Sequence, residues 1–107
     1  MFAPWEEAHP VEMRPGLARR TLATGERTMV CEFRGRAGVV VPDHAHPYEQ
    51  AGYMVSGEFA ITIGGEERVV RPGDSYVILG GQSHSVRCAT DFVIVETFTP
   101  PRDEFRT

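Results

Sequence analysis

The sequence predicts an all-β protein whose strands close into a small barrel or a two-sheet jelly roll. From residue 16 onward, short runs rich in Val, Ile, Thr and aromatic residues alternate with Gly, Pro and Asp, and no convincing helix interrupts them. Because an open sheet of many short strands would expose unpaired edges, the strands are expected to close into a barrel or a two-sheet jelly roll. The mouth of a small barrel can hold one ligand. With 107 residues, 41% of them hydrophobic and 24% charged, the chain suits one folded domain.

The N-terminal segment is expected to differ from the rest of the chain. Pro4, Pro10 and Pro15 prevent continuous regular structure there. Residues 1–15 should therefore form an arm that runs over the barrel or a neighbouring molecule, and residues 16–107 should form the single barrel domain. His9 lies in the arm and is expected to face solvent or pack against protein rather than bind metal.

Eight strands are expected after the arm. They span residues 27–33, 39–41, 50–55, 58–63, 67–70, 76–79, 83–87 and 92–98. Gly64 and Gly65 suit a two-residue hairpin turn, which needs positive φ, and Arg-Pro-Gly-Asp at 71–74 suits a type II turn. Both turns predict antiparallel neighbours.

Composition excludes several classes of function. The net charge of −4 and the lack of a basic block argue against a nucleic-acid partner. All eleven basic residues are Arg, so no lysine can form a Schiff base or hold pyridoxal. With no apolar run long enough for a bilayer and no signal-peptide pattern, we expect a cytoplasmic protein without a membrane partner. Cys31 and Cys88 are too few for a disulfide scaffold and should lie in the core.

The strongest chemical signal is the pair His44 and His46. On a strand, residues two apart project from the same face, so both imidazoles could reach one metal ion. Gln50 follows four residues later, and His84 comes far downstream on another expected strand, so only a folded barrel can unite them. The alternative is that these are ordinary polar residues on solvated strand faces.

The spacing of these residues resembles the first cupin motif. Gly38, His44, His46, Gln50 and Gly57 are separated by five, one, three and six residues, with Gln where most cupins have Glu. This resemblance implies a cupin-type double-stranded β-helix, which is a jelly-roll barrel, with a metal bound by His44, His46, Gln50 and His84.

The second cupin motif follows after a short interval. Gly73, Leu79, Gly81 and His84 are separated by five, one and two residues, with Leu79 replacing the usual Pro and Cys88 the usual Asn. Fifteen residues separate the two motifs, which is similar to compact microbial cupins.

The expected ligands are chemically neutral. Three imidazoles and an amide leave the charge of a divalent cation uncancelled, so a small anionic ligand would be favoured beside it. The set departs from the two-His, one-carboxylate arrangement of many non-haem iron oxygenases. One divalent transition metal is expected, and Zn, Ni, Fe, Cu and Mn all stay open.

The stretch 92–98 adds a carboxylate to the expected interior. If it is a strand, Glu96 shares one face with apolar residues such as Phe98, and burial would raise its pKa toward the range of a general acid or base. The alternative is a Glu exposed at the barrel rim. Arg102 could bind a carboxylate through its guanidinium fork, or be a solvated terminal Arg.

Segments 44–53, 57–66 and 97–102 resemble the pectin-degradation cupins, which open the ring of 4,5-unsaturated uronates to a linear keto acid. In that group Gln is a metal ligand at the position of Gln50. The resemblance places the active-site acid, aromatic and arginine on Glu96, Phe98 and Arg102. The acid of the group is usually Asp, so Glu96 carries one additional methylene.

Other functions stay open at the level of sequence. A cupin could bind metal and a small anionic ligand, such as a sugar acid, without catalysis. A three-His dioxygenase and a purely structural barrel are further alternatives, although three intact histidines argue against the last. The apolar stretch 28–33 would gain from pairing with a second copy, so a homodimer is expected.

Overall fold

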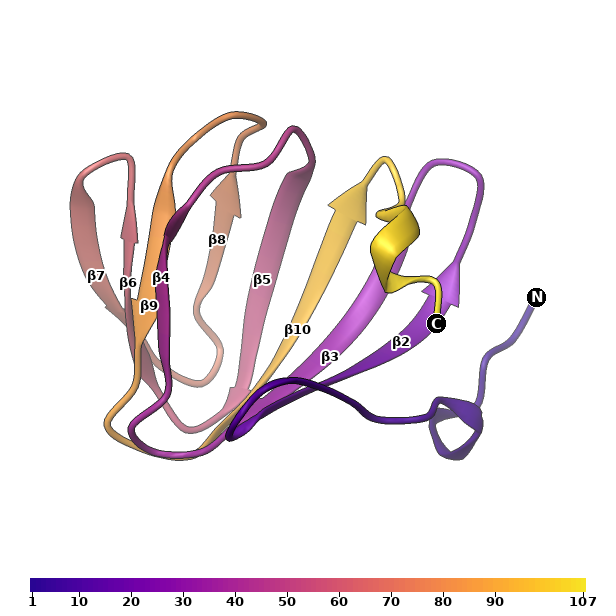
Figure 1. The fold of residues 1–107 in the computed structure, drawn as a ribbon, viewed down its shortest axis with the longest axis horizontal. Helices are drawn as coiled ribbons and strands as arrows, with labels where there is room; N and C mark the ends of the chain where they lie inside the picture. Colours follow the sequence, from indigo (N-terminus) through magenta and orange to yellow (C-terminus); the bar gives the residue numbers. More distant parts are fainter.

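The computed structural model describes residues 1–107 as two antiparallel sheets that face each other (Figure 1). The larger sheet has the strand order β1-β2-β3-β10-β5-β8, and the smaller has the order β4-β9-β6-β7. The elements are η1 (Trp5–Glu7), β1 (Val11–Arg14), β2 (Leu17–Thr24), β3 (Met29–Gly35), β4 (Val40–His44), β5 (Glu49–Ser56), β6 (Phe59–Ile63), β7 (Glu66–Val70), β8 (Ser75–Ile78), β9 (His84–Arg87), β10 (Phe92–Thr99) and η2 (Asp103–Phe105). The predicted all-β jelly roll is confirmed, and no helix is long and apolar enough to cross a membrane.

Of the two predicted turns, only the first joins antiparallel neighbours; the turn at 71–74 connects β7 of the smaller sheet to β8 of the larger sheet, which do not pair, so that part of the prediction is wrong. Gly64 and Gly65 have φ values of 55° and 87° and connect β6 to β7, which pair from Phe59 with Val70 to Ile63 with Glu66. The turn at 71–74 is closed by a hydrogen bond from the Asp74 amide to the Arg71 carbonyl at 2.9 Å. Glycine is needed at the first turn because both central residues of a two-residue loop adopt positive φ.

The N-terminal region contains more strand than the sequence predicted. β1 lies inside the segment 1–15 that we expected to be an arm, and it pairs with β2, which the sequence did not predict at all. Arg19 explains the missed strand, because its side chain lies on an inward face and is only 2% exposed. An alternation of apolar and polar residues cannot reveal a strand whose buried positions include a charge. Before β1, η1 and exposed His9 form the remaining arm.

The inward faces of the two sheets form one apolar core. Strand β10 shows the pattern most clearly, since Phe92, Ile94, Glu96 and Phe98 are buried and alternate with residues that are only partly covered. Aromatic rings meet edge to face across the core, as expected from their quadrupoles. Cys31 and Cys88 are buried, free thiols, as predicted.

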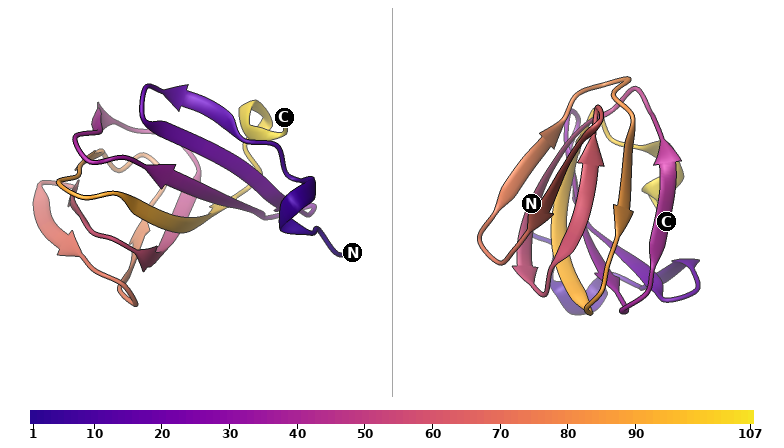
Figure 2. Two further views of the ribbon diagram at one scale, coloured as in Figure 1. Left: turned by 90° about the horizontal axis from the view of Figure 1, so that it is seen from below. Right: turned by 90° about the vertical axis from the view of Figure 1, so that its left-hand side faces the viewer.

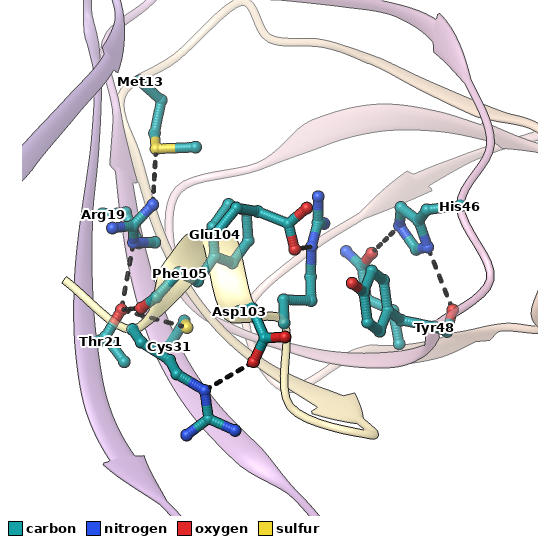
Figure 3. Close-up of polar contacts among 12 residues, drawn as sticks. Met13, Arg19, Thr21, Cys31, His46, Tyr48, Asp103, Glu104 and Phe105 are labelled. Atoms are coloured by element: carbon teal, nitrogen blue, oxygen red, sulfur yellow. Dashed lines mark hydrogen bonds and ion pairs between the residues drawn. The ribbon is translucent and has the colours of Figure 1, made fainter.

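The C-terminal segment covers one side of the barrel beside β2 and β3 (Figures 1 and 2). Phe105 packs against Phe33 with ring centroids 6.1 Å apart, and its carbonyl accepts a hydrogen bond from Thr21 Oγ1. Arg19 donates to Met13 and Thr21 (Figure 3), and it also donates to the Thr107 carbonyl. These contacts satisfy the buried guanidinium and fasten the segment that carries Arg102.

Candidate metal centre

Three histidines meet at the end of the barrel that is uppermost in Figure 1. His44 ends β4, His84 begins β9, and the two are register partners in the smaller sheet. His46 lies beyond the end of β4, in the loop that leads to β5. The loop, rather than the pleat of a single strand, therefore brings His46 to the other two, and this differs from the geometry that the sequence suggested. One ligand nitrogen from each ring lies within 4.8 Å of the others.

Backbone carbonyls fix the orientation of all three rings. Nδ1 of His44 lies 2.9 Å from the Pro42 carbonyl, and Nδ1 of His84 lies 3.0 Å from the Gln82 carbonyl. Nδ1 of His46 lies 3.1 Å from the Tyr48 carbonyl (Figure 3). A carbonyl only accepts hydrogen bonds, so each Nδ1 carries the hydrogen and each Nε2 presents a lone pair, which is the arrangement typical of metal-binding histidines.

Gln50, near the start of β5, supplies an oxygen to the same cluster. Its Nε2 donates to Glu96 Oε2 at 2.5 Å, and its Oε1 lies 2.9 Å from Nε2 of His46. Because Nδ1 of His46 already carries the hydrogen, two lone pairs then face each other across that gap. Either a doubly protonated His46 or a cation relieves the repulsion. Burial and the nearby Arg102 charge lower the pKa of His46, although its contacts with Gln50 and the Tyr48 carbonyl act in the opposite direction.

His84 gives a second indication of a cation. It is 3% exposed, and its Nε2 is buried without a hydrogen-bond partner. An unpaired buried polar atom is costly unless something satisfies it. The donor set of three imidazole nitrogens and one amide oxygen therefore fits a divalent transition metal. His9 is not part of the cluster.

Glu96 lies directly behind Gln50 on the neighbouring strand β10. It is only 7% exposed, so the exposed-rim alternative is wrong. Burial raises the pKa of Glu96, although the hydrogen bonds from Tyr76 and Gln50 act in the opposite direction. Both bonds go to Oε2, and Oε1 makes no hydrogen bond within the protein. A carboxylate here supplies negative charge close to a cluster of neutral donor groups.

Phe98 and Arg102 also lie close to the cluster. The Phe98 ring is 1% exposed and sits 6.3 Å from the His46 ring, centroid to centroid. The Arg102 guanidinium lies 4.0 Å from the centre of the Phe105 ring and 5.1 Å from those of Phe98 and Tyr48. The side chain is 17% exposed, so it is held by aromatic faces rather than freely solvated, and cation–π contact stabilises it.

A cavity of about 380 Å³ opens onto these groups, a size typical of small-molecule sites. The site residues that line it are His44, Gln50, His84, Glu96, Phe98 and Arg102. Met13 and Arg14 of β1 also line it, so the strand that the sequence missed forms part of the wall. Of the seven predicted site residues, six therefore line one cavity, and His46 joins them through its cluster with His44 and His84.

Tyr76 was missed by sequence reasoning. Its phenol donates to Glu96 Oε2 at 2.6 Å, and burial together with the Glu96 charge raises the pKa of Tyr76 well above its ordinary value. The phenol therefore stays protonated and can only donate to the carboxylate. The sequence feature that could have indicated Tyr76 is Gly52. It is an inward-facing glycine within a strand, and such a glycine often marks the close approach of a neighbouring group.

Comparison with known proteins agrees with this geometry. The sequence matches the Cupin domain family over residues 33–98, more than half of the chain. It is 28% identical over 104 residues to the pectin degradation protein KdgF of Dickeya dadantii (strain 3937), covering 95% of this chain and 90% of that protein.

Two solved structures are similar over nearly the whole chain. KdgF from Halomonas sp. has a TM-score of 0.89 and 29% identity, covering 97% of this chain and 96% of that one. An RmlC-like cupin from Shewanella frigidimarina NCIMB 400 has a TM-score of 0.92 and 29% identity, covering 97% and 94%. The chain therefore belongs to the cupin family and is a small cupin related to the pectin-degradation protein KdgF.

Proposed function

We propose that this cupin is a metal-dependent enzyme that opens the ring of 4,5-unsaturated uronates to linear keto acids. The observation that carries the proposal is the Glu96 carboxylate, which is buried beside the three-His and Gln50 cluster and faces the same cavity as Arg102. A proton-transfer group, a cation site and a fixed guanidinium around one small cavity suit a small sugar acid. The relation to KdgF supports the same class of substrate.

The residues that would hold the metal are His44, His46, Gln50 and His84, through three Nε2 atoms and one Oε1. A divalent metal bound there supplies Lewis-acid chemistry to a substrate oxygen. The identity of the metal is open among Zn, Ni, Fe, Cu and Mn, since imidazole-rich ligation suits several of these ions.

The remaining residues bind the substrate and move a proton. Ring opening is an isomerisation in which the anomeric hydroxyl loses a proton, the ring C–O bond breaks to leave an aldehyde and an enolate, and the enolate takes up a proton at carbon to become the ketone. Glu96 Oε1 is free of hydrogen bonds within the protein and lines the cavity, so it can accept and return that proton. Arg102 would hold the uronate carboxylate through its guanidinium fork. Phe98 would wall the cavity and exclude water.

The test is turnover of a 4,5-unsaturated galacturonate by the metal-loaded protein. Loss of the ultraviolet absorbance of the conjugated alkene is followed, and NMR identifies the product. Faster decay than the spontaneous reaction, abolished by a chelator and restored by metal, is expected. Bound metal and saturable binding of the sugar acid without faster decay would instead identify a cupin that binds a small anionic ligand without catalysis.

We also propose that the molecule forms a homodimer. The apolar stretch 28–33, which the sequence suggested as the pairing segment, lies mostly in β3 and is paired on both sides by β2 and β10, so the interface is assigned instead to the outer face of β5 and β8. Tyr53, Val55, Val77 and Leu79 are each about half exposed on or beside these strands, and β8 is an edge of the larger sheet. An apolar sheet face with an open edge favours association with a second copy. Light scattering on a size-exclusion column should give twice the chain mass, and Val77→Glu should give the monomer. A wild-type monomer at micromolar concentration would contradict the proposal.

A further inference from the structure

Tyr76 and Glu96 face each other across a gap made by a glycine. Strands β8, β5 and β10 are neighbours, and Tyr76, Gly52 and Glu96 are direct register partners across them. A Cβ on Gly52 would lie 2.6 Å from the Tyr76 phenol oxygen and would overlap the ring. Only glycine at this position lets the phenol lie over the middle strand and reach a carboxylate two strands away.

The Glu96 carboxylate accepts hydrogen bonds from two donors. Tyr76 Oη donates to Glu96 Oε2 at 2.6 Å, and Gln50 Nε2 donates to the same oxygen at 2.5 Å. The distances are those of strong, charge-assisted hydrogen bonds. Glu96 is therefore held from two sides, and Gln50 is held with its amide nitrogen toward Glu96 and its oxygen toward His46.

We infer that Tyr76 is a positioning residue for the metal centre: it fixes the Glu96 carboxylate, which in turn keeps the Gln50 oxygen directed at the three histidines. The inference deepens the proposed function and rests on the proposed metal site. An amide can rotate about its terminal torsion and present either oxygen or nitrogen. Without an anchored acceptor behind it, Gln50 would turn its nitrogen toward His46 part of the time, and an amide nitrogen is no metal ligand.

Chain length explains why a phenol is needed here. The Glu96 side chain has one more methylene, and so one more rotatable bond, than an Asp at the same position would have. A carboxylate at the end of a longer side chain needs an additional contact to occupy one position, and Tyr76 supplies it. A Glu96→Asp variant should withdraw the carboxylate from the phenol and so remove the influence of Tyr76.

The experiment measures the dissociation constant of Zn²⁺ by competition with a chromophoric chelator. Tyr76→Phe removes only the phenol oxygen and should weaken Zn²⁺ binding about tenfold, the lower end of the range for groups that orient metal ligands. Tyr53→Phe is the matched control, because Tyr53 is 53% exposed on the opposite face of β5, and it should leave the dissociation constant unchanged. Thermal unfolding of the metal-free variants checks that the fold is intact.

A double-mutant cycle with Glu96→Asp separates positioning from a general structural role. Adding Tyr76→Phe to Glu96→Asp should change the Zn²⁺ dissociation constant by less than twofold, because the phenol no longer touches the carboxylate. Equal Zn²⁺ affinity of Tyr76→Phe and Tyr53→Phe, or the same tenfold loss in both backgrounds, would overturn the inference. Since metal affinity needs no substrate, wild type that fails to turn over uronate would refute the proposed activity alone.

Discussion

Replacing Phe98 tests whether its ring belongs to the core, the site or both. The side chain is 1% exposed. It packs edge to face against Phe33 and Phe105, with centroids 6.4 Å and 5.4 Å away, and it also meets His46. Truncation to alanine at so buried a position removes transfer free energy, leaves a cavity and loses aromatic pairing. The expected cost is about 3–5 kcal/mol of the free energy of unfolding.

That loss is large for a chain of this size. Total stability of a small domain is about 5–15 kcal/mol, and 1 kcal/mol corresponds to roughly 4–8 °C in Tm. Phe98→Ala should therefore lower Tm by about 12–40 °C in calorimetry of the metal-free protein. Its loss of activity alone would say nothing about catalysis, because much of the chain could be unfolded at the assay temperature.

Phe98→Leu keeps most of the apolar volume and separates the two roles. It should cost about 1–2 kcal/mol and leave the protein folded, so a rise in KM for the uronate would then report the loss of the cavity wall. Met54→Leu is the control, since Met54 is fully buried and does not line the cavity; it should cost less than about 1.5 kcal/mol and leave KM unchanged. If Phe98→Ala melts within about 5 °C of wild type, the ring does not support the core as described.

Three further substitutions test Glu96, His84 and the hydrogen bond between Trp5 and Glu32. Glu96→Gln keeps an oxygen that accepts from Gln50 and Tyr76 but loses the ionisable group and its negative charge. Metal affinity should weaken, so turnover is compared at saturating metal, where it should still fall at least about 100-fold. Turnover near that of wild type would refute the proton-transfer role of Glu96. His84→Ala should lower Zn²⁺ affinity by at least about 100-fold in chelator competition, because the loss of a group that only orients a metal ligand already lowers metal affinity about tenfold. Unchanged Zn²⁺ affinity would exclude His84 as a ligand. Burial opposes ionisation of Glu32, but hydrogen bonds from Arg34 and Trp5 outweigh it and lower the pKa of Glu32 below its ordinary value of 4.5. Glu32 therefore stabilises the fold at pH values above its ordinary pKa, and this contribution is lost as the pH falls through the lowered pKa. The free energy of urea unfolding should then depend less on pH in the acid range for Glu32→Gln than for wild type. Parallel pH profiles of the two proteins would contradict this.

The fold and the members of the site could be predicted because they depend on local signals. Glycine turns such as Gly64-Gly65 fix which strands pair, and the alternation along residues 92–98 fixes which side chains enter the core. The spacing of His44, His46 and His84 within two motifs was enough to expect convergence. The sequence argument for this convergence was incomplete, because it placed His44 and His46 on one strand face. In the structure, the loop after β4 places His46.

The rest depends on contacts between distant segments. The sequence around Arg19 does not predict a buried guanidinium, because two of its contacts, with Thr107 and Phe105, come from the far end of the chain. Tyr76 and Glu96 meet only through the register of three strands, and that register is set by the whole sheet rather than by either sequence neighbourhood. The orientation of the Gln50 amide follows from that same long-range contact.

The most direct test of the central claim is anomalous diffraction at the zinc edge from crystals of the Zn²⁺-loaded protein. The account predicts one strong peak per chain, about 2.0–2.2 Å from Nε2 of His44, His46 and His84 and from Oε1 of Gln50. A peak bound by other residues, or no peak among the three histidines at full metal loading, would contradict it.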